Sequence, residues 1–398
     1  MSEDWRTVPL GEVLNLDVEQ RVVEPQGTYQ IVGVLNRGRG ILHRGALPGS
    51  ATRYARLNRV RGDHVVYSRL KAFEGAVTVA PPGVDCYASP EFPTFSCRDS
   101  LLPAYMRLVT TLPSFWVTLE GLSKGMGGRR ERVSPADFLT AAINLPPLHV
   151  QRRIVDLMAH LDDHLENLKA EIEAGARLEA RFLERLLESA GSVQMLALGD
   201  VGEFIRGRRF TKADYVPFGL GCIHYGQVHT HFGPIATEVL TYVPAEMQSR
   251  LRLARAGDVV IAATSEDLSG LGKATAWLGD SDVAVHDDCY IFRHRLDPKY
   301  ATYALASPWF QSQKTQFGDG MKVTRISSSD LAKIQIPVPP RETQIRVGEA
   351  MASLTSKSEA MRTEVASLTT LRQCLLSLLL SGQVQIPTGF DELLAEVA

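Results

Sequence analysis

Ile143-Asn144-Leu145-Pro146-Pro147 is followed by Gln151 and then by a long stretch without proline. The same pattern recurs as Ile336-Pro337-Val338-Pro339-Pro340 with Gln344, 193 residues further along the chain. A Pro-Pro pair ends an extended segment and suits the approach to a helix N-terminus. The sequence therefore predicts a strand followed by a long helix, and predicts it twice.

Apolar residues seven positions apart follow each copy, a spacing typical of two helices packed along a seam. The predicted seam positions are Ile154, Leu161, Leu168, Gly175 and Phe182 in the first stretch and Val347, Leu354, Met361, Leu368 and Leu375 in the second. Further apolar residues are expected to widen the seam: Leu157, Leu165, Ile172, Leu186, Met351, Val365, Leu371, Leu378 and Leu379. Because a whole domain separates the two helices, we expect them to pair antiparallel. The alternative is that each helix packs only on its own domain.

Other segments recur in the same order, which indicates a duplicated domain rather than a short solenoid repeat. Examples are Leu10-Gly11-Glu12-Val13 with Leu198-Gly199-Asp200-Val201, and Leu112-Pro113-Ser114-Phe115 with Ser307-Pro308-Trp309-Phe310. We predict an α+β fold with two globular domains (1–149 and 193–340), each followed by a helix (150–192 and 341–382), and a tail (383–398). Within the domains, 101–117 and 298–313 are expected to be helical and broken at Pro113 and Pro308.

The composition is that of an ordinary globular protein, with 44% hydrophobic and 22% charged residues and a net charge of −2. No apolar run reaches the ~18 residues of a membrane span, and the N-terminus lacks a signal-peptide layout. The five cysteines are scattered and form no C-x-x-C pair. We therefore expect a cytoplasmic protein that does not contact a membrane.

Motifs for chemistry are weak. No Pro-Pro site has the form of an adenine-methyltransferase loop, and Gly270-Leu271-Gly272-Lys273-Ala274-Thr275 departs from the phosphate-loop pattern. His224, His229 and His231 near Cys222 could hold a metal, although a histidine-bearing turn is favoured because no second ligand pair follows. Asp287 and Asp288 beside His286 could form a nuclease site, although a solvated turn is favoured. We expect no catalytic centre, metal or cofactor in this chain.

The window from Arg37 to Lys71 carries a local net charge of +8, with Tyr54 and Tyr67 interleaved. Arginine can contact guanine or phosphate with two donors, and tyrosine is expected to add hydrogen bonds to phosphates. Such a window favours DNA binding, although a solvated basic face is the alternative. Two Gly-rich basic loops, which could equally be plain turns, lie at 124–130 and 318–322. The DNA-binding candidates are Arg37, Arg39, Arg44, Arg53, Arg56, Arg59, Arg69, Lys71, Lys124, Arg129, Arg130, Arg206, Arg208, Arg209, Lys212, Lys322 and Arg325.

The duplicated Pro-Pro, glutamine and heptad pattern resembles the specificity subunits of type I restriction–modification systems over nearly the whole chain. One departure is Arg341-Glu342, where the first copy has Leu148-His149. The resemblance implies two target-recognition domains, each reading half of a split, asymmetric sequence in double-stranded DNA. It also implies spacer helices that dock methyltransferase subunits, two of them, with restriction/translocase subunits joining afterwards.

By the same resemblance, the partner subunits would carry the methyl donor, ATP and Mg²⁺, and this subunit would be non-catalytic. The alternative function is a coiled-coil scaffold that binds proteins without reading DNA sequence. The near-neutral net charge favours the scaffold, whereas the basic window favours DNA recognition.

Overall fold

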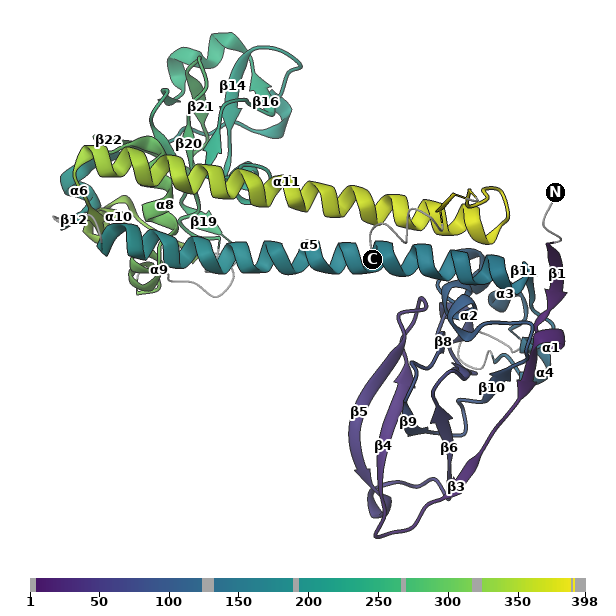
Figure 1. Ribbon diagram of the computed structural model, residues 1–398. Helices are drawn as coiled ribbons and strands as arrows, with labels where there is room; N and C mark the ends of the chain where they lie inside the picture. Colours follow the sequence, from purple (N-terminus) through teal and green to yellow (C-terminus); the bar gives the residue numbers. More distant parts are fainter. Residues whose placement is uncertain are drawn as a thin grey trace. The chain divides into compact units, whose positions relative to one another are not determined.

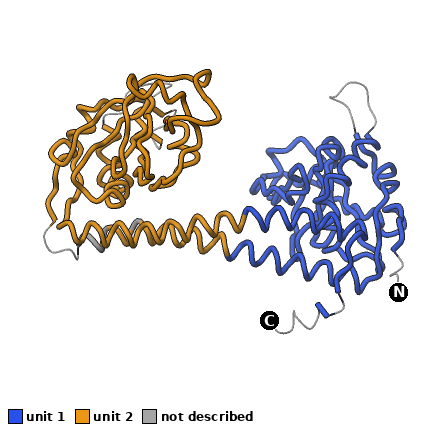
Figure 2. Tube along the Cα trace, turned by 90° about the horizontal axis from the view of Figure 1, so that it is seen from above, with its two compact units in different colours: residues 1–167, 366–398 blue, residues 168–365 orange. Residues whose placement is uncertain are grey.

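The computed structural model describes residues 5–123, 132–188, 193–265, 270–316, 324–387 and 389–390. The chain divides into two compact units, with residues 1–167 and 366–398 in unit 1 and residues 168–365 in unit 2 (Figure 2). Each unit contains one globular domain and part of each of two long helices. Among the described residues, none of the helices combines the length and apolar character needed to cross a bilayer.

The first domain holds a four-stranded sheet of order β2-β10-β7-β8 and a five-stranded sheet of order β3-β6-β9-β4-β5. Strands β1 and β11, from its two ends, pair with each other antiparallel. The elements are β1 (Arg6–Pro9), α1 (Leu10–Val13), β2 (Leu14–Leu16), β3 (Gln20–Val22), β4 (Thr28–Val34), β5 (Ile41–Pro48), β6 (Arg56–Arg61), β7 (Val65–Tyr67), β8 (Val77–Val79), β9 (Asp85–Ala88), β10 (Thr94–Cys97), α2 (Pro103–Val109), α3 (Pro113–Gly121), α4 (Pro135–Phe138) and β11 (Ala142–Leu145).

The second domain repeats this plan with different detail. Its sheets have the orders β13-β22-β18-β20-β15 and β16-β14-β21-β17, and β12 pairs with β24. The elements are β12 (Gln194–Ala197), α6 (Leu198–Val201), β13 (Gly202–Arg206), β14 (Leu220–Ile223), α7 (Tyr225–Thr230), β15 (Ile235–Ala236), β16 (Thr241–Val243), β17 (Leu253–Ala254), β18 (Val259–Ala262), β19 (Thr264–Ser265), β20 (Ala274–Trp277), β21 (Val283–Val285), β22 (Cys289–His294), α8 (Pro298–Ala306), α9 (Pro308–Lys314), β23 (Thr324–Arg325), α10 (Ser328–Lys333) and β24 (Gln335–Val338).

The duplication seen in the sequence corresponds to shared local structure. The order β2-β10-β7-β8 of the first domain matches β13-β22-β18-β20 of the second. Pro113 begins α3 and Pro308 begins α9, which confirms that each predicted helical stretch is broken at its proline. The remaining sheets differ in strand number and order, so the domains diverge in this layer.

The two repeated glutamines make equivalent hydrogen bonds. Gln151 Nε2 donates to Pro146 O at 2.8 Å, and Leu102 N donates to Gln151 Oε1 at 2.9 Å. Gln344 Nε2 donates to Pro339 O at 2.9 Å, and Asp297 N donates to Gln344 Oε1 at 2.9 Å. Each buried amide therefore links the start of a long helix to the Pro-Pro segment and to the start of a domain helix.

The long helices α5 (Leu148–Glu188) and α11 (Arg341–Leu380) lie side by side in both units (Figure 1). In unit 1, Arg372 Nη2 donates to Asp162 Oδ2 at 2.7 Å. Ile154 and Met158, earlier in α5, share a core with Leu379, later in α11.

In unit 2, Ser358 Oγ donates to Glu179 Oε1 at 3.1 Å, and Leu183 shares a core with Val347 and Met351. Early residues of α5 meet late residues of α11 in unit 1, and late residues of α5 meet early residues of α11 in unit 2. The pairing is therefore antiparallel, and the predicted fold is confirmed. The alternative also holds locally, because Ile154 and Val347 belong to the cores of their own domains.

One expectation about the seam is wrong. Leu371 and Leu378 are 55% and 37% exposed, so they do not widen it. Helix α5 is continuous through Gly175. A Cβ added at Gly175 would lie 3.5 Å from Ser358 Oγ of α11, so this seam position faces the other helix. The other predicted seam positions are buried or half-buried: Ile154, Leu161, Leu168, Phe182, Val347, Leu354, Met361, Leu368 and Leu375.

Candidate nucleic-acid interface

The basic window of the first domain begins at the β4–β5 hairpin, whose second strand is the edge of the five-stranded sheet. Arg37 and Arg39 are exposed in the turn, where Arg37 has a φ of 60°. Arg44 is exposed on β5, with its guanidinium over Gly33, where an added Cβ would lie 3.2 Å from Nε. The hairpin thus presents three arginines to solvent, two in its turn and one on its edge strand.

Arg53 and Arg56 lie at the opposite end of this sheet. They are exposed around the start of β6, and Tyr54 between them is 49% exposed. Because β4 spans 7 residues, the two ends are separated by roughly 20 Å. The window therefore forms two exposed groups of arginines rather than one patch.

Arg59, between these groups on β6, is held by acidic residues that are distant in sequence. Its guanidinium donates to Asp85 at 2.8 and 2.7 Å and to Glu19 at 3.0 Å. These contacts hold the pKa of Asp85 below its ordinary value, chiefly through the hydrogen bond from Arg59. Arg61 is paired with Asp17 at 2.7 Å. The local net charge of the window therefore overstates the positive charge available here.

The last part of the window is mostly structural. Tyr67 was expected to contact phosphates, but it is fully buried, stacks on Phe138 at 4.3 Å and donates to Val133 O. Arg69 is half-buried, and its Nε is buried without a hydrogen-bond partner. Lys71 is exposed and lies 3.5 Å from Glu74.

The second domain has a group of basic residues at the end of β13 and in the segment that follows. Arg206, Arg208, Arg209 and Lys212 are all exposed there, and we call residues 206–212 the basic loop. Buried Phe210 within the loop packs in a small core with Met247 and Leu251. The loop is thus a basic surface on an apolar anchor, a combination suited to phosphate contacts.

Strand β21 brings a second group of arginines to the same region. Val285 O accepts from Arg208 N at 2.9 Å, and Val285 N donates to Arg252 O at 3.0 Å. Arg250 and Arg252 are exposed. Their closeness to the basic loop depends on strand pairing across about seventy residues, so only the clustering of basic residues could be read from the sequence.

The remaining candidates are less informative. Arg325 is exposed on β23, which pairs with β19. Both Gly-rich basic loops, 124–130 and 318–322, lie outside the described residues, and with them the candidates Lys124, Arg129, Arg130 and Lys322. None of the candidate positions is tested by these observations, and they stay predictions.

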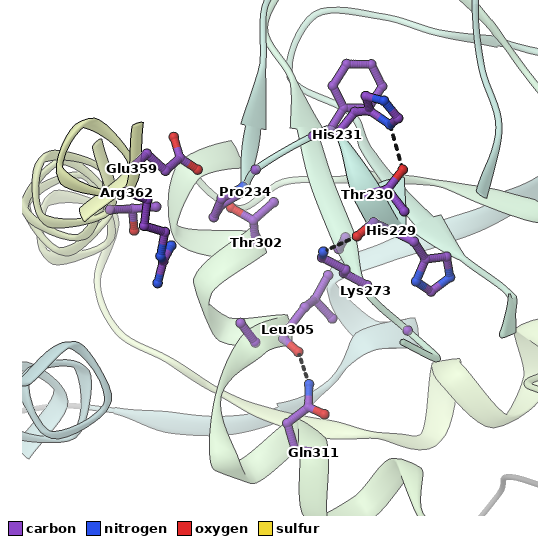
Figure 3. Close-up of a pocket in the computed structure, with 16 residues that line it drawn as sticks. His229, Thr230, His231, Pro234, Lys273, Thr302, Leu305, Gln311, Glu359 and Arg362 are labelled. Carbon is purple, nitrogen blue, oxygen red and sulfur yellow. Dashed lines mark hydrogen bonds between the residues drawn. The ribbon is translucent and has the colours of Figure 1, made fainter. Parts of the chain in front are cut away.

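A cavity of about 390 Å³ in unit 2 brings together residues of two weak motifs, His229 and His231 with Gly272 and Lys273 (Figure 3). Lys273 Nζ donates to His229 O at 2.7 Å, so its ammonium is engaged by the protein's own backbone. Thr230 Oγ1 lies 2.6 Å from His231 Nδ1. Within the described part of the chain, no group of three or more potential ligands is placed to hold a metal ion.

The acidic pair of the second domain is an ion-pair site. His286 Nδ1 lies 2.9 Å from Asp288 Oδ2 and 3.2 Å from Asp287 Oδ1. Burial alone would raise the pKa of Asp288, but the hydrogen bond and charge of His286 outweigh it and lower that pKa. The expectation of a solvated turn is therefore wrong in part, because Asp288 is largely buried and paired.

Known proteins were compared with this chain by sequence. No family model matches it. The type I restriction enzyme MjaX specificity subunit of Methanocaldococcus jannaschii is 21% identical over 270 residues. The match covers 62% of this chain, and it spans 60% of that relative.

Solved structures match over nearly the whole chain. The HsdS subunit of Thermoanaerobacter tengcongensis has a TM-score of 0.51 at 21% identity, covering 96% of this chain and 98% of that one. The type I specificity subunit of M. genitalium has a TM-score of 0.57 at 16% identity, covering 95% and 96%. A chain from a type I restriction–modification system, solved to explain complex assembly and conformational transition, has a TM-score of 0.58 at 21% identity, covering 94% and 97%. The chain therefore has the fold of the type I restriction–modification specificity subunits to which it is similar.

Proposed function

We propose that this chain is the DNA-specificity subunit of a type I restriction–modification complex. Each globular domain would read one half of a split, asymmetric target, and the paired helices would dock methyltransferase subunits. The observation that carries the proposal is the repeated architecture: two domains with a common sheet order, each continuing into a long helix that pairs antiparallel with the other.

The electrostatic surface supports DNA as the ligand. Exposed arginines of the β4–β5 hairpin and of the basic loop would neutralise phosphates and release counterions, which supplies affinity. Arginine and amide side chains on base edges would supply sequence preference. The chain would contribute no catalytic group, and methyl transfer, ATP hydrolysis and cleavage would belong to partner subunits.

The direct test is binding of the full chain to a randomised duplex pool, followed by sequencing of the bound DNA and titration at several salt concentrations. We expect enrichment of a split motif and a binding constant that falls steeply with salt. The double variant R208A/R209A should weaken binding and reduce the salt slope by about two. Arg59→Ala is the control, because its guanidinium is already neutralised.

A non-DNA scaffold predicts a different result. Enrichment of no motif, together with equal weak binding of all sequences, would contradict DNA recognition and favour the scaffold. Equal effects of Arg59→Ala and R208A/R209A would mean that the basic loop is not the phosphate-contacting surface.

A further inference from the structure

The basic loop is fastened to the connection between β21 and β22. Gly207 N donates to Cys289 O at 3.0 Å, and Arg208 N donates to Val285 O at 2.9 Å. A Cβ on Gly207 would lie 2.1 Å from His286 O and 2.3 Å from Val285 O. Only glycine permits this approach, so the loop lies directly against the backbone of the connection.

His286 adds a side-chain bridge to this contact. Its Nε2 lies 2.9 Å from the backbone oxygen of Phe210 in the loop. Its Nδ1 faces the carboxylates of Asp288 at 2.9 Å and Asp287 at 3.2 Å. The imidazole also contacts the Phe210 ring edge-to-face, with centroids 4.8 Å apart. One ring thus joins the loop to two acidic residues.

The partners of His286 decide its protonation state. A backbone oxygen and an ionised carboxylate only accept hydrogen bonds, so both ring nitrogens must donate. A neutral ring bonded to Phe210 O would place an unprotonated Nδ1 against two carboxylates. Among the described residues, a donor at that nitrogen is Asp288 N at 3.4 Å, which is longer than either carboxylate contact. The geometry therefore calls for an imidazolium.

The electrostatics agree with this assignment. Burial would lower the pKa of His286, but the hydrogen bond to Asp288 and the charges of Asp288 and Asp287 raise it above the ordinary value of 6.5. Nearby His224 shifts in the opposite direction, because burial lowers its pKa. Other titratable or charged groups around the site include Tyr215, Tyr225, Cys289 and Lys212, and Arg206 Nε donates to Asp287 O at 2.9 Å. Of the two imidazoles, His286 is therefore the one whose charged form is stabilised.

We propose that His286 is a positioning residue for DNA recognition: its imidazolium bridges the Phe210 backbone oxygen and the Asp288 carboxylate, and so holds the basic loop in the conformation that contacts DNA. The part of this inference that concerns DNA rests on the proposed function, whereas the bridge between His286 and the basic loop does not. Because the folded-state pKa is raised, the bridge is complete below pH 6.5 and is lost as pH rises through the raised pKa. Contacts from the basic loop should weaken in the same interval.

The bridge itself can be measured without DNA. Amide hydrogen exchange of residues 204–212 in the full chain, corrected for the intrinsic pH dependence, would be followed by mass spectrometry from about pH 5.5 to about pH 9. We expect protection to fall by about tenfold as the wild-type histidine loses its proton. His286→Gln keeps a donor for Phe210 O without a charge, so its protection should not depend on pH.

Asp288→Asn is the second variant, because its amide oxygen can still accept from Tyr225 N, which now lies 3.3 Å from Asp288 Oδ1. Loss of the carboxylate should move the loss of loop protection to lower pH. His164→Gln, at an exposed position of α5, is the matched control and should behave as wild type. Identical pH profiles in wild type and His286→Gln would overturn the proposal.

The DNA measurement separates this proposal from the proposed function. Affinity for the selected target should fall with pH in parallel with loop protection, and His286→Gln should remove that component. A loop that responds to pH while the affinity does not would show that His286 does not position a DNA contact. If wild type binds no DNA at any pH, the proposed function fails, and the exchange data still decide whether the bridge exists.

Discussion

Single side chains connect the repeated motif to the fold. Gln151 is fully buried and Gln344 is 5% exposed, and each amide both donates and accepts within its own copy. Leaving a buried polar group without a partner lowers the free energy of unfolding by more than a hydrogen bond raises it. Both the amide nitrogen and the amide oxygen of each glutamine therefore need their partners. This explains why glutamine stands at the same distance from Pro-Pro in both copies.

Replacing either glutamine by alanine should therefore lower the free energy of unfolding. Gln151→Ala and Gln344→Ala each leave a backbone N–H without its acceptor, and we expect a loss of about 1–3 kcal/mol in urea unfolding. Gln373→Ala, at an exposed position of α11, is the control and should change stability by less than about 0.5 kcal/mol. If all three variants unfold alike, the glutamines do not secure the junctions.

The contrast between Gln151 and Arg59 shows what sequence can predict at this scale. The glutamine acts within a few residues of Pro-Pro and repeats, so its importance is visible in the sequence. Arg59 is neutralised by Glu19 and Asp85, which lie 40 and 26 residues away and meet it only through strand pairing. Tyr67 was misassigned for the same reason, because its burial depends on packing against Phe138.

At the scale of elements, the long helices were the most predictable part. Their heptads continue over many turns, and a helix follows from local pattern. The sheets follow from strand pairings between distant segments, which explains why the second sheet of each domain could not be foreseen. The heptad pattern also did not distinguish buried from exposed leucines beside the seam. Leu379 is 1% exposed, whereas Leu371 is 55% exposed on the same helix.

These two leucines give a paired test of the helix packing. Leu379→Ala removes buried side chain from the core of unit 1, and we expect a loss of about 2–5 kcal/mol. Leu371→Ala should stay within about 0.5 kcal/mol, because its side chain is largely in water. Chemical denaturation of both variants measures this. Equal losses would mean that Leu371 is covered in the folded protein and that the assigned packing of α11 is wrong.

At the scale of the whole molecule, the duplication gives a consistent account of function. Each unit contains one domain and parts of both long helices, and each domain packs against both helices. Two domains with a common framework and divergent second sheets suit the independent recognition of two half-targets. A pair of continuous helices suits a fixed spacing between those half-targets.

Lengthening both helices tests the spacing. Inserting four residues after Glu173 in α5 and after Ala366 in α11 adds about 6 Å to each helix and is tolerated in helix pairs as a stutter. That length is close to two base-pair steps of about 3.4 Å. We expect the two half-targets to keep their sequences while the unspecified gap between them grows by about one or two base pairs. An unchanged gap would show that the helices do not set the spacing.

Exchange of one domain tests the central claim most directly. Residues 1–149 would be replaced by the equivalent domain of a homologue of different specificity, and the chimera would be expressed with the methyltransferase subunits of its system. Long-read sequencing of the modified DNA then gives the methylated motif of each version. The account predicts that one half of the motif changes to that of the donor while the other half stays the same. A motif that changes in both halves, or in neither, would contradict the claim that the two domains read DNA independently.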